Sequence, residues 1–149
     1  TPPMPVSAGA PSLDIRGRIL LAEDNPISRD LVQLMLEDSQ CEVVAEENGR
    51  QAVERLVEEP FDLVLMDCHM PEMDGYEATR RIRQSTDPLR ARVPILALTA
   101  SALESDRRRC EAVGMNEVLS KPISQQDLVR ALDRWLGRAR GASAPRPMP

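Results

Sequence analysis

Polar residues with the chemistry to act on a phosphoryl group follow four of the short strands that this sequence predicts. Glu23 and Asp24 follow the first strand, Asp67 the third, Thr99 the fourth and Lys121 the fifth. Carboxylates held close together repel one another and favour a hard cation such as Mg²⁺. A hydroxyl and an ammonium group can hold phosphoryl oxygens. The set therefore indicates phosphoryl chemistry in which one carboxylate acts as the nucleophile.

Segment 63–75 is the most informative stretch. Four apolar residues, 63–66, run without a break into Asp67, which predicts a buried strand that ends in a carboxylate. Pro71 removes a backbone donor and Gly75 permits dihedral angles that other residues avoid, so a shaped loop is expected after Asp67. Taken alone, Asp67 could equally cap the next helix, and the rest of the chain decides between the two interpretations.

Strand and helix alternate five times along the chain. Strands are expected at residues 18–22, 42–46, 63–66, 93–98 and 117–120. Helices are expected from residue 26, then at 49–60, 76–83, 104–113 and 124–137. Their inward faces are assigned to Ile27, Leu31, Leu34, Met35, Val53, Leu56, Val57, Leu128, Leu132, Trp135 and Leu136. This alternation predicts a doubly wound α/β fold, with a parallel sheet covered on both faces. The strand carboxyl ends then share one edge, where the polar residues converge.

Charge and cysteine content narrow the class of protein. The net charge of −5 argues against a nucleic-acid surface, and the arginines at 80, 81, 83 and 107–109 are expected on solvent-exposed helix faces. No apolar run approaches the roughly 20 residues of a membrane span, and no export signal is evident. The cysteines at 41, 68 and 110 lack a paired or metal-type spacing, which favours a reduced, cytoplasmic setting.

The ends of the chain differ from its centre. Residues 1–16 and 138–149 are rich in Pro, Ala, Ser and Gly, a composition typical of disordered linkers. Residues 17–137 are expected to form one domain. The chain opens at Thr1 without an initiator methionine, which is consistent with a piece of a longer protein.

Three motifs carry a resemblance to a known family. They are Ala22-Glu23-Asp24-Asn25-Pro26, the run from Met66-Asp67-Cys68-His69-Met70-Pro71 to Glu72-Met73-Asp74-Gly75-Tyr76-Glu77-Ala78-Thr79, and Leu119-Ser120-Lys121-Pro122. Over about residues 17–136 the chain resembles a response-regulator receiver domain, most closely the receivers of hybrid sensor histidine kinases in two-component phosphorelays. The resemblance implies a flavodoxin-like five-stranded sheet of order 2-1-3-4-5.

The resemblance also implies roles for individual residues. Asp67 is implied to accept a phosphoryl group from a phosphohistidine. Asp24 and Asp67 are implied to coordinate Mg²⁺, together with the backbone carbonyl of His69 and a water-mediated contact from Glu23. The implied partner is therefore a histidine kinase or a histidine-containing phosphotransfer protein.

Thr99 and Lys121 are implied to bind the aspartyl phosphate, and the Lys121–Pro122 peptide is expected to be cis. One position departs from the family. Receivers usually carry an aromatic residue three positions before the lysine, and here that position is Val118. We therefore expect the signal to pass through the loop and helix after Thr99, or the domain to serve mainly as a phosphate relay.

Alternative functions remain open from the sequence. An unphosphorylated pseudo-receiver would act only by docking, although its usual mark, loss of an acid or of the lysine, is absent. A haloacid-dehalogenase-like phosphatase would need a second Asp where His69 stands. A calcium loop ending at Asp74-Gly75 fails because Met70 occupies a position that requires an acid.

The remaining expectations concern the whole protein. His69 is the single histidine, and no Gly-rich nucleotide box is present, so the chain is not expected to be a complete kinase. Enzyme activity is left open: the domain itself is expected only to take up and lose its own phosphoryl group, but it could belong to a hybrid histidine kinase. The three motifs favour the C-terminal receiver of a hybrid kinase over a stand-alone regulator. The domain is expected in the cytoplasm, or as the cytoplasmic part of a membrane-bound sensor kinase. No direct contact with nucleic acid or membrane is expected, and a weak homodimer is left open.

Overall fold

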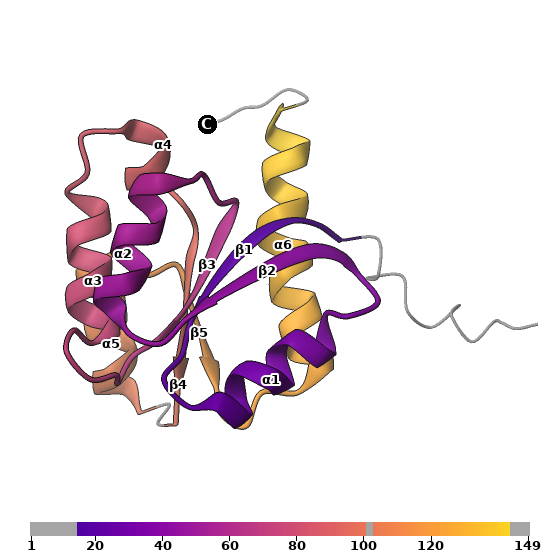
Figure 1. The fold of residues 1–149 in the computed structure, drawn as a ribbon, viewed down its shortest axis with the longest axis horizontal. Helices are drawn as coiled ribbons and strands as arrows, with labels where there is room; N and C mark the ends of the chain where they lie inside the picture. Colours follow the sequence, from indigo (N-terminus) through magenta and orange to yellow (C-terminus); the bar gives the residue numbers. More distant parts are fainter. Residues whose placement is uncertain (1–14, 101–102, 144–149) are drawn as a thin grey trace, which may run out of the picture.

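The computed structural model describes residues 15–100 and 103–143. They form a five-stranded, all-parallel sheet of order β2-β1-β3-β4-β5 (Figure 1), which confirms the predicted fold and strand order. The strands are β1 Arg16–Ala22, β2 Gln40–Glu46, β3 Leu63–Asp67, β4 Ile95–Thr99 and β5 Glu117–Ser120. The first two strands begin two residues before the predicted starts, because their early residues pair with each other in parallel register.

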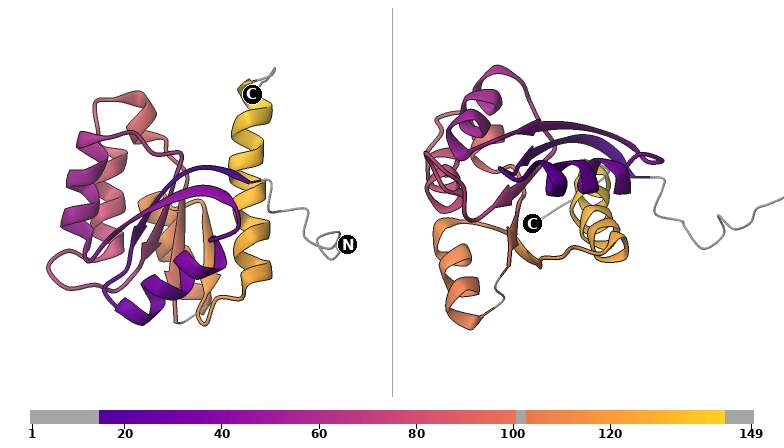
Figure 2. Two further views of the ribbon diagram at one scale, coloured as in Figure 1. Left: turned by 45° about the vertical axis from the view of Figure 1, so that its right-hand side comes forward. Right: turned by 60° about the horizontal axis from the view of Figure 1, so that its bottom comes forward.

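Helices cover both faces of the sheet. The helices are α1 Pro26–Met35, α2 Gly49–Glu58, α3 Gly75–Arg83, α4 Pro88–Ala91, α5 Glu104–Val113 and α6 Gln125–Ser143. Helices α1 and α6 lie on one face, and α2, α3 and α5 lie on the other (Figures 1 and 2). The short α4 was not predicted. Helix α6 continues to Ser143, whereas the sequence placed its end at Gly137. In the part of the chain described here, no helix has the length and apolarity needed to cross a membrane.

The strand residues alternate between two apolar layers. Ile19 and Leu21 point into the layer shared with α1 and α6. Leu20 and Ala22 point into the layer shared with α2, α3 and α5. Because both faces are covered, every residue of β3 and β4 is buried, and this is why those strands read as unbroken apolar runs. The predicted linkers at 1–16 and 138–149 fall mostly outside the described residues, but Arg16 belongs to β1.

Helix α1 turns a different face to the core than the sequence suggested. Val32 and Leu36 are buried, whereas Ile27 is 76% exposed and Leu34 is 64% exposed. Leu31 is 41% exposed. The exposed residues and the buried residues each recur at a helical period, so periodicity alone could not tell which set faces the core. The assignment of Ile27, Leu31 and Leu34 to the core was therefore wrong.

Helix α2 shows a smaller error of the same kind. Ala52 and Leu56 are buried against the sheet, while Val57 is 60% exposed. Two predicted helix boundaries are confirmed, at the end of α5 and at the start of α6. Gly114 ends α5 with φ of 107°, in the left-handed region. The Ser124 hydroxyl accepts a hydrogen bond from the Asp127 amide at the start of α6.

Arg83 is a structural residue and not part of a solvent face. Its guanidinium donates hydrogen bonds to the carbonyl oxygens of Gly114, Ala91 and Val93 over 2.7–2.9 Å. It also donates to the Asn116 side chain at 2.8 Å. Burial lowers the pKa of Arg83. These partners join the end of α3 to the residues around α4 and to the turn after α5.

We predict that Arg83→Met lowers the free energy of unfolding by about 2 kcal/mol or more, because several carbonyl groups lose a charged donor. Urea titration of both proteins gives the difference. Arg80→Met is the matched control. Its exposed contact with Glu77 is of a kind that contributes about 0–1 kcal/mol. Equal losses in the two variants would contradict this role for Arg83.

Candidate functional site

Strand pairing places the predicted carboxylates side by side. In the β1–β3 pair Ala22 lies opposite Met66, so the next residues, Glu23 and Asp67, leave the sheet as neighbours. The Glu23 amide donates to the Glu46 carbonyl at 3.0 Å and extends the β1–β2 ladder by one bond. The position of both side chains is therefore set by backbone hydrogen bonding at the centre of the sheet.

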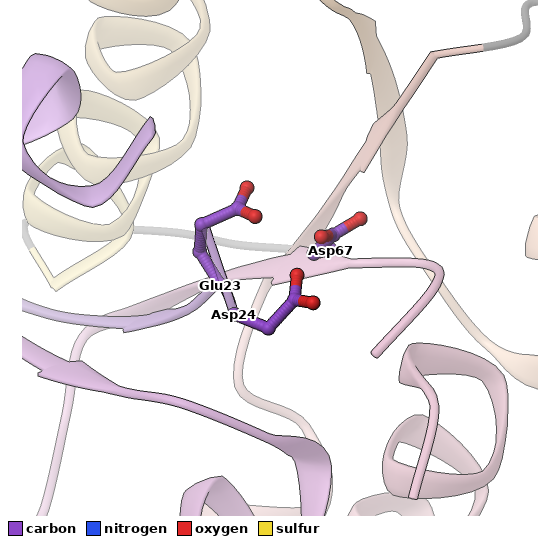
Figure 3. Close-up of side chains that lie close together, drawn as sticks. All are labelled: Glu23, Asp24 and Asp67. Carbon is purple, nitrogen blue, oxygen red and sulfur yellow. The ribbon is translucent and has the colours of Figure 1, made fainter. Parts of the chain in front are cut away.

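Glu23, Asp24 and Asp67 form one oxygen cluster (Figure 3). One carboxylate oxygen from each lies within 4.8 Å of the others. Glu23 and Asp67 are buried, whereas Asp24 faces solvent. The cluster is thus open on one side and closed on the other.

Lys121 provides the positive charge for this cluster. Its Nζ atom lies 2.8 Å from Glu23 Oε1 and 3.3 Å from Asp67 Oδ2. Burial alone would lower the pKa of Lys121, but the hydrogen bond and charge of Glu23 and the charge of Asp67 outweigh it, and the pKa is raised. The ammonium form therefore persists between two carboxylates.

Glu23 is the most deeply buried carboxylate of the cluster. Burial raises its pKa, and the hydrogen bond from Lys121 only partly opposes that shift. Its second oxygen accepts a hydrogen bond from the Asn25 amide at 3.1 Å. The Arg29 guanidinium donates to its backbone carbonyl at 2.8 Å. Folding thus brings Glu23 into a place that disfavours its charged form.

Thr99 and Lys121 end neighbouring strands. Thr99 is the buried last residue of β4 and lies opposite Ser120 of β5. The Lys121 amide donates to the Thr99 carbonyl at 2.8 Å, so the two backbones stay joined past the last strand residue. The Lys121–Pro122 peptide is cis, as the resemblance led us to expect.

The loop after Asp67 is held close to that residue. The His69 amide donates to Asp67 Oδ1 at 3.2 Å, and the His69 side chain is exposed. Glu72, not a glycine, adopts a positive φ of 65°. From the sequence, Gly75 is expected for its dihedral freedom. The structure requires it for space, because a Cβ atom there would collide with the Asp67 carbonyl oxygen. The loop therefore folds back onto the strand that it follows.

Val118 lies in β5, half-buried and packed against the layer formed with α2, α3 and α5. Its small side chain occupies the position where the family resemblance leads one to expect an aromatic ring. The predicted site residues thus fall into two groups. Glu23, Asp24, Asp67 and Lys121 make one contact cluster, while Thr99, His69 and Val118 border it on the neighbouring strands and loop.

The donor atoms fit a magnesium ion. All are oxygens, which Mg²⁺ prefers, and ligands at about 2.1 Å on opposite sides of such an ion lie about 4 Å apart. The spread of 4.8 Å in the cluster is close to that value. It also leaves room for water, which Mg²⁺ commonly retains.

Comparisons with known proteins agree with this geometry. The family model for the response regulator receiver domain matches residues 19–133. The sensor protein GacS of Pseudomonas syringae pv. syringae is 43% identical over 142 residues, which are 95% of this chain and 15% of GacS. The histidine-protein kinase BarA of Escherichia coli (strain K12) is 38% identical over 117 residues, which are 78% of this chain and 12% of BarA. The chain thus spans a small part of these relatives.

Solved structures of receiver domains share this fold. One is the receiver domain of sensor histidine kinase PA1611 from Pseudomonas aeruginosa PAO1, with magnesium coordinated in its active-site cleft. It is 44% identical with a TM-score of 0.75, over 81% of this chain and 98% of that one. Another is the receiver domain of Ssk1 in complex with the histidine phosphotransfer protein Ypd1 of Saccharomyces cerevisiae. That match has 28% identity and a TM-score of 0.78, over 85% of this chain and 92% of that one.

We predict that Asp24→Asn slightly stabilises the metal-free protein, because one of three like charges is removed. Mg²⁺ at about 100 times its dissociation constant should raise the wild-type free energy of unfolding by about 2.7 kcal/mol. At the same concentration it should raise the variant's far less. Asp38→Asn, an exposed change outside the cluster, is the control. Equal stabilisation of all three proteins by Mg²⁺ would exclude a metal site at Asp24.

Proposed function

This chain belongs to the response regulator receiver domain family, and from that premise we propose that Asp67 accepts a phosphoryl group from a phosphohistidine in a Mg²⁺-dependent reaction. The observation that carries the proposal is the cluster itself. A nucleophilic carboxylate, two further carboxylates and a lysine converge on one open edge of the sheet. This is the set of groups that in-line phosphoryl transfer requires.

The proposed reaction forms one bond and breaks one. A carboxylate oxygen of Asp67 attacks phosphorus, the P–N bond to the donor imidazole breaks, and that imidazole nitrogen keeps the electron pair. Lys121 then leaves its contact with Asp67 for a phosphoryl oxygen and holds the aspartyl phosphate, with help from the Thr99 hydroxyl at the next strand end. Lys121 needs little displacement because it already lies beside Asp67.

Asp24, Asp67 and the backbone carbonyl of His69 are the proposed metal ligands, with Glu23 acting through water. When bound, Mg²⁺ supplies charge neutralisation for the incoming phosphoryl oxygens. The burial of Glu23 supports its part in this set, since a buried carboxylate gains from a nearby cation.

Two alternatives are less well supported. A docking-only pseudo-receiver gives no reason for Glu23, Asp67 and Lys121 to be held together at the cost of burial. A phosphatase of the haloacid-dehalogenase type requires an acid two residues after the nucleophile, where an exposed histidine stands. The phosphoacceptor function is the one that uses every charged group of the cluster.

The small side chain of Val118 bears on how the signal leaves the site. Since no aromatic ring is available at that position, the proposed response to phosphorylation is movement of the loop and helix after Thr99, or onward relay of the phosphoryl group. Residues 17–137 are the proposed receiver unit. We place it in the cytoplasmic part of a longer hybrid kinase, in line with the relatives named above.

We predict that incubation with acetyl phosphate and Mg²⁺ adds one phosphoryl group, seen as a single step in intact mass. Excess EDTA should abolish the gain, because the carboxylates then lack the neutralising cation. Asp67→Asn should also abolish it. Asp74→Asn is the control, since that carboxylate caps α3. A phosphoryl group that persists in Asp67→Asn would place the acceptor elsewhere.

The exposed face of α1 is the proposed docking surface for the phosphohistidine partner. Ile27 and Leu31 lie on the helix that follows Asp24 directly, and both are solvent-exposed. A cavity of about 90 Å³ between α1 and the start of α6 is lined by Leu31, Met35 and Pro122 and reaches Glu23. An apolar surface at the rim of the site would hold a partner helix while its histidine reaches Asp67.

We predict that Ile27→Glu slows phosphoryl transfer from the cognate phosphorylated histidine phosphotransfer protein by about tenfold or more, because a charge enters the apolar contact. Transfer from acetyl phosphate should be unchanged. Leu89→Glu is the matched control, since Leu89 is 85% exposed and lies on α4, apart from the site. If Leu89→Glu slowed protein-dependent transfer as much as Ile27→Glu, α1 would not be the docking surface.

A further inference from the structure

Two cysteines far apart in the sequence meet behind the phosphoacceptor. The Sγ atoms of Cys68 and Cys110 are 3.8 Å apart, although the residues are 42 positions apart in the sequence. Both side chains are buried, and neither forms a disulfide. Cys68 follows Asp67 directly, and Cys110 belongs to α5. The spacing of the two cysteines does not predict this pair, because only the fold brings the two positions together.

We propose that Cys68 and Cys110 form a redox site, in which a peroxide-class oxidant joins them in a disulfide that fastens α5 to the sheet beside Asp67. A disulfide requires sulfurs about 2.05 Å apart. The two sulfurs are already 3.8 Å apart, so a small inward shift of α5 would bring them to bonding distance. The third cysteine, Cys41, lies on β2 at the other end of the sheet order and takes no part.

Helix α5 is suited to such a shift. Within Glu104–Val113 only Cys110 and Val113 are buried. Arg109 adds one further contact, with its guanidinium carbon 3.9 Å from the centre of the Tyr76 ring. A helix held by so few buried side chains opens locally at low cost. Peroxide reaches the thiols during such openings, which burial otherwise prevents.

The chemistry balances with two thiols and one peroxide. One thiol sulfur, having lost its proton, attacks a peroxide oxygen. The O–O bond breaks, and a sulfenic acid and hydroxide form. The second sulfur then attacks the sulfenic sulfur, the S–O bond breaks, and hydroxide leaves. The two protons from the thiols convert the two hydroxides to water, so the pair is oxidised by two electrons and the peroxide is reduced.

The consequence for signalling rests on the proposed function, although formation of the disulfide does not. Helix α5 is the helix after Thr99, which we propose to move on phosphorylation. A covalent link from α5 to the residue after Asp67 would restrain that movement. Oxidation would therefore let Asp67 take a phosphoryl group while α5 stays in its unphosphorylated position.

The test is peroxide treatment of the full chain at low protein concentration, without any phosphodonor. Remaining thiols are then alkylated under denaturing conditions and mapped by peptide mass. We expect a Cys68–Cys110 cross-link, an alkylated Cys41, and reversal by dithiothreitol. Cys41→Ala should give the same cross-link, whereas Cys110→Ala should give no disulfide at Cys68. Asp67→Asn should also form the link, so loss of phosphoacceptor function leaves this result intact.

A second measurement needs no variant that risks misfolding. Hydrogen exchange of the α5 amides should slow by about tenfold or more in the oxidised wild type, because local opening is suppressed. The redox site is overturned if Cys68 and Cys110 both remain alkylated after peroxide treatment, whether or not Cys41 is oxidised. The restraint on α5 is overturned if the cross-link forms and exchange in α5 does not change.

Discussion

Repulsion among Glu23, Asp24 and Asp67 is the constraint on which the arrangement of this domain depends. Carboxylates within 4.8 Å of one another oppose folding unless a positive charge lies between them. Lys121 supplies that charge and contacts both buried members of the cluster. The backbone hydrogen bond from the Lys121 amide to the Thr99 carbonyl holds Lys121 there. This edge of the sheet thus holds three carboxylates together with the ammonium group of Lys121.

The sheet order explains why this edge, and not another, carries the site. The chain leaves β1 toward β2 on one side and later returns to form β3 on the other. Loops that depart in opposite directions leave a crevice at the carboxyl ends of β1 and β3, where ligands of doubly wound folds usually bind. Glu23 and Asp67 stand at those two ends. Their burial is offset in part by the ammonium group of Lys121, which contacts both carboxylates.

Much of the fold and the contact cluster could be predicted because their signals are local. Strands covered on both faces appear as unbroken apolar runs, and their ends are marked by Glu23, Asp67 and Lys121. What failed depended on tertiary packing. Two apolar stripes on α1 satisfy the same period, so Ile27 was taken for a core residue although it is exposed. The carbonyl partners of Arg83 come from the residues around α4 and from the turn after α5, which no pattern around residue 83 reveals.

Lys121 offers the most direct test because it is the only lysine in the chain. Isotope-labelled lysine therefore gives a single side-chain NMR signal from the centre of the site. The account predicts that this signal shifts when Mg²⁺ is added and shifts again with beryllofluoride, an analogue of the phosphoryl group. The second shift should be absent in Asp67→Asn. A folded wild-type protein whose lysine signal responds to neither addition would contradict the assignment of this edge as the phosphoacceptor site.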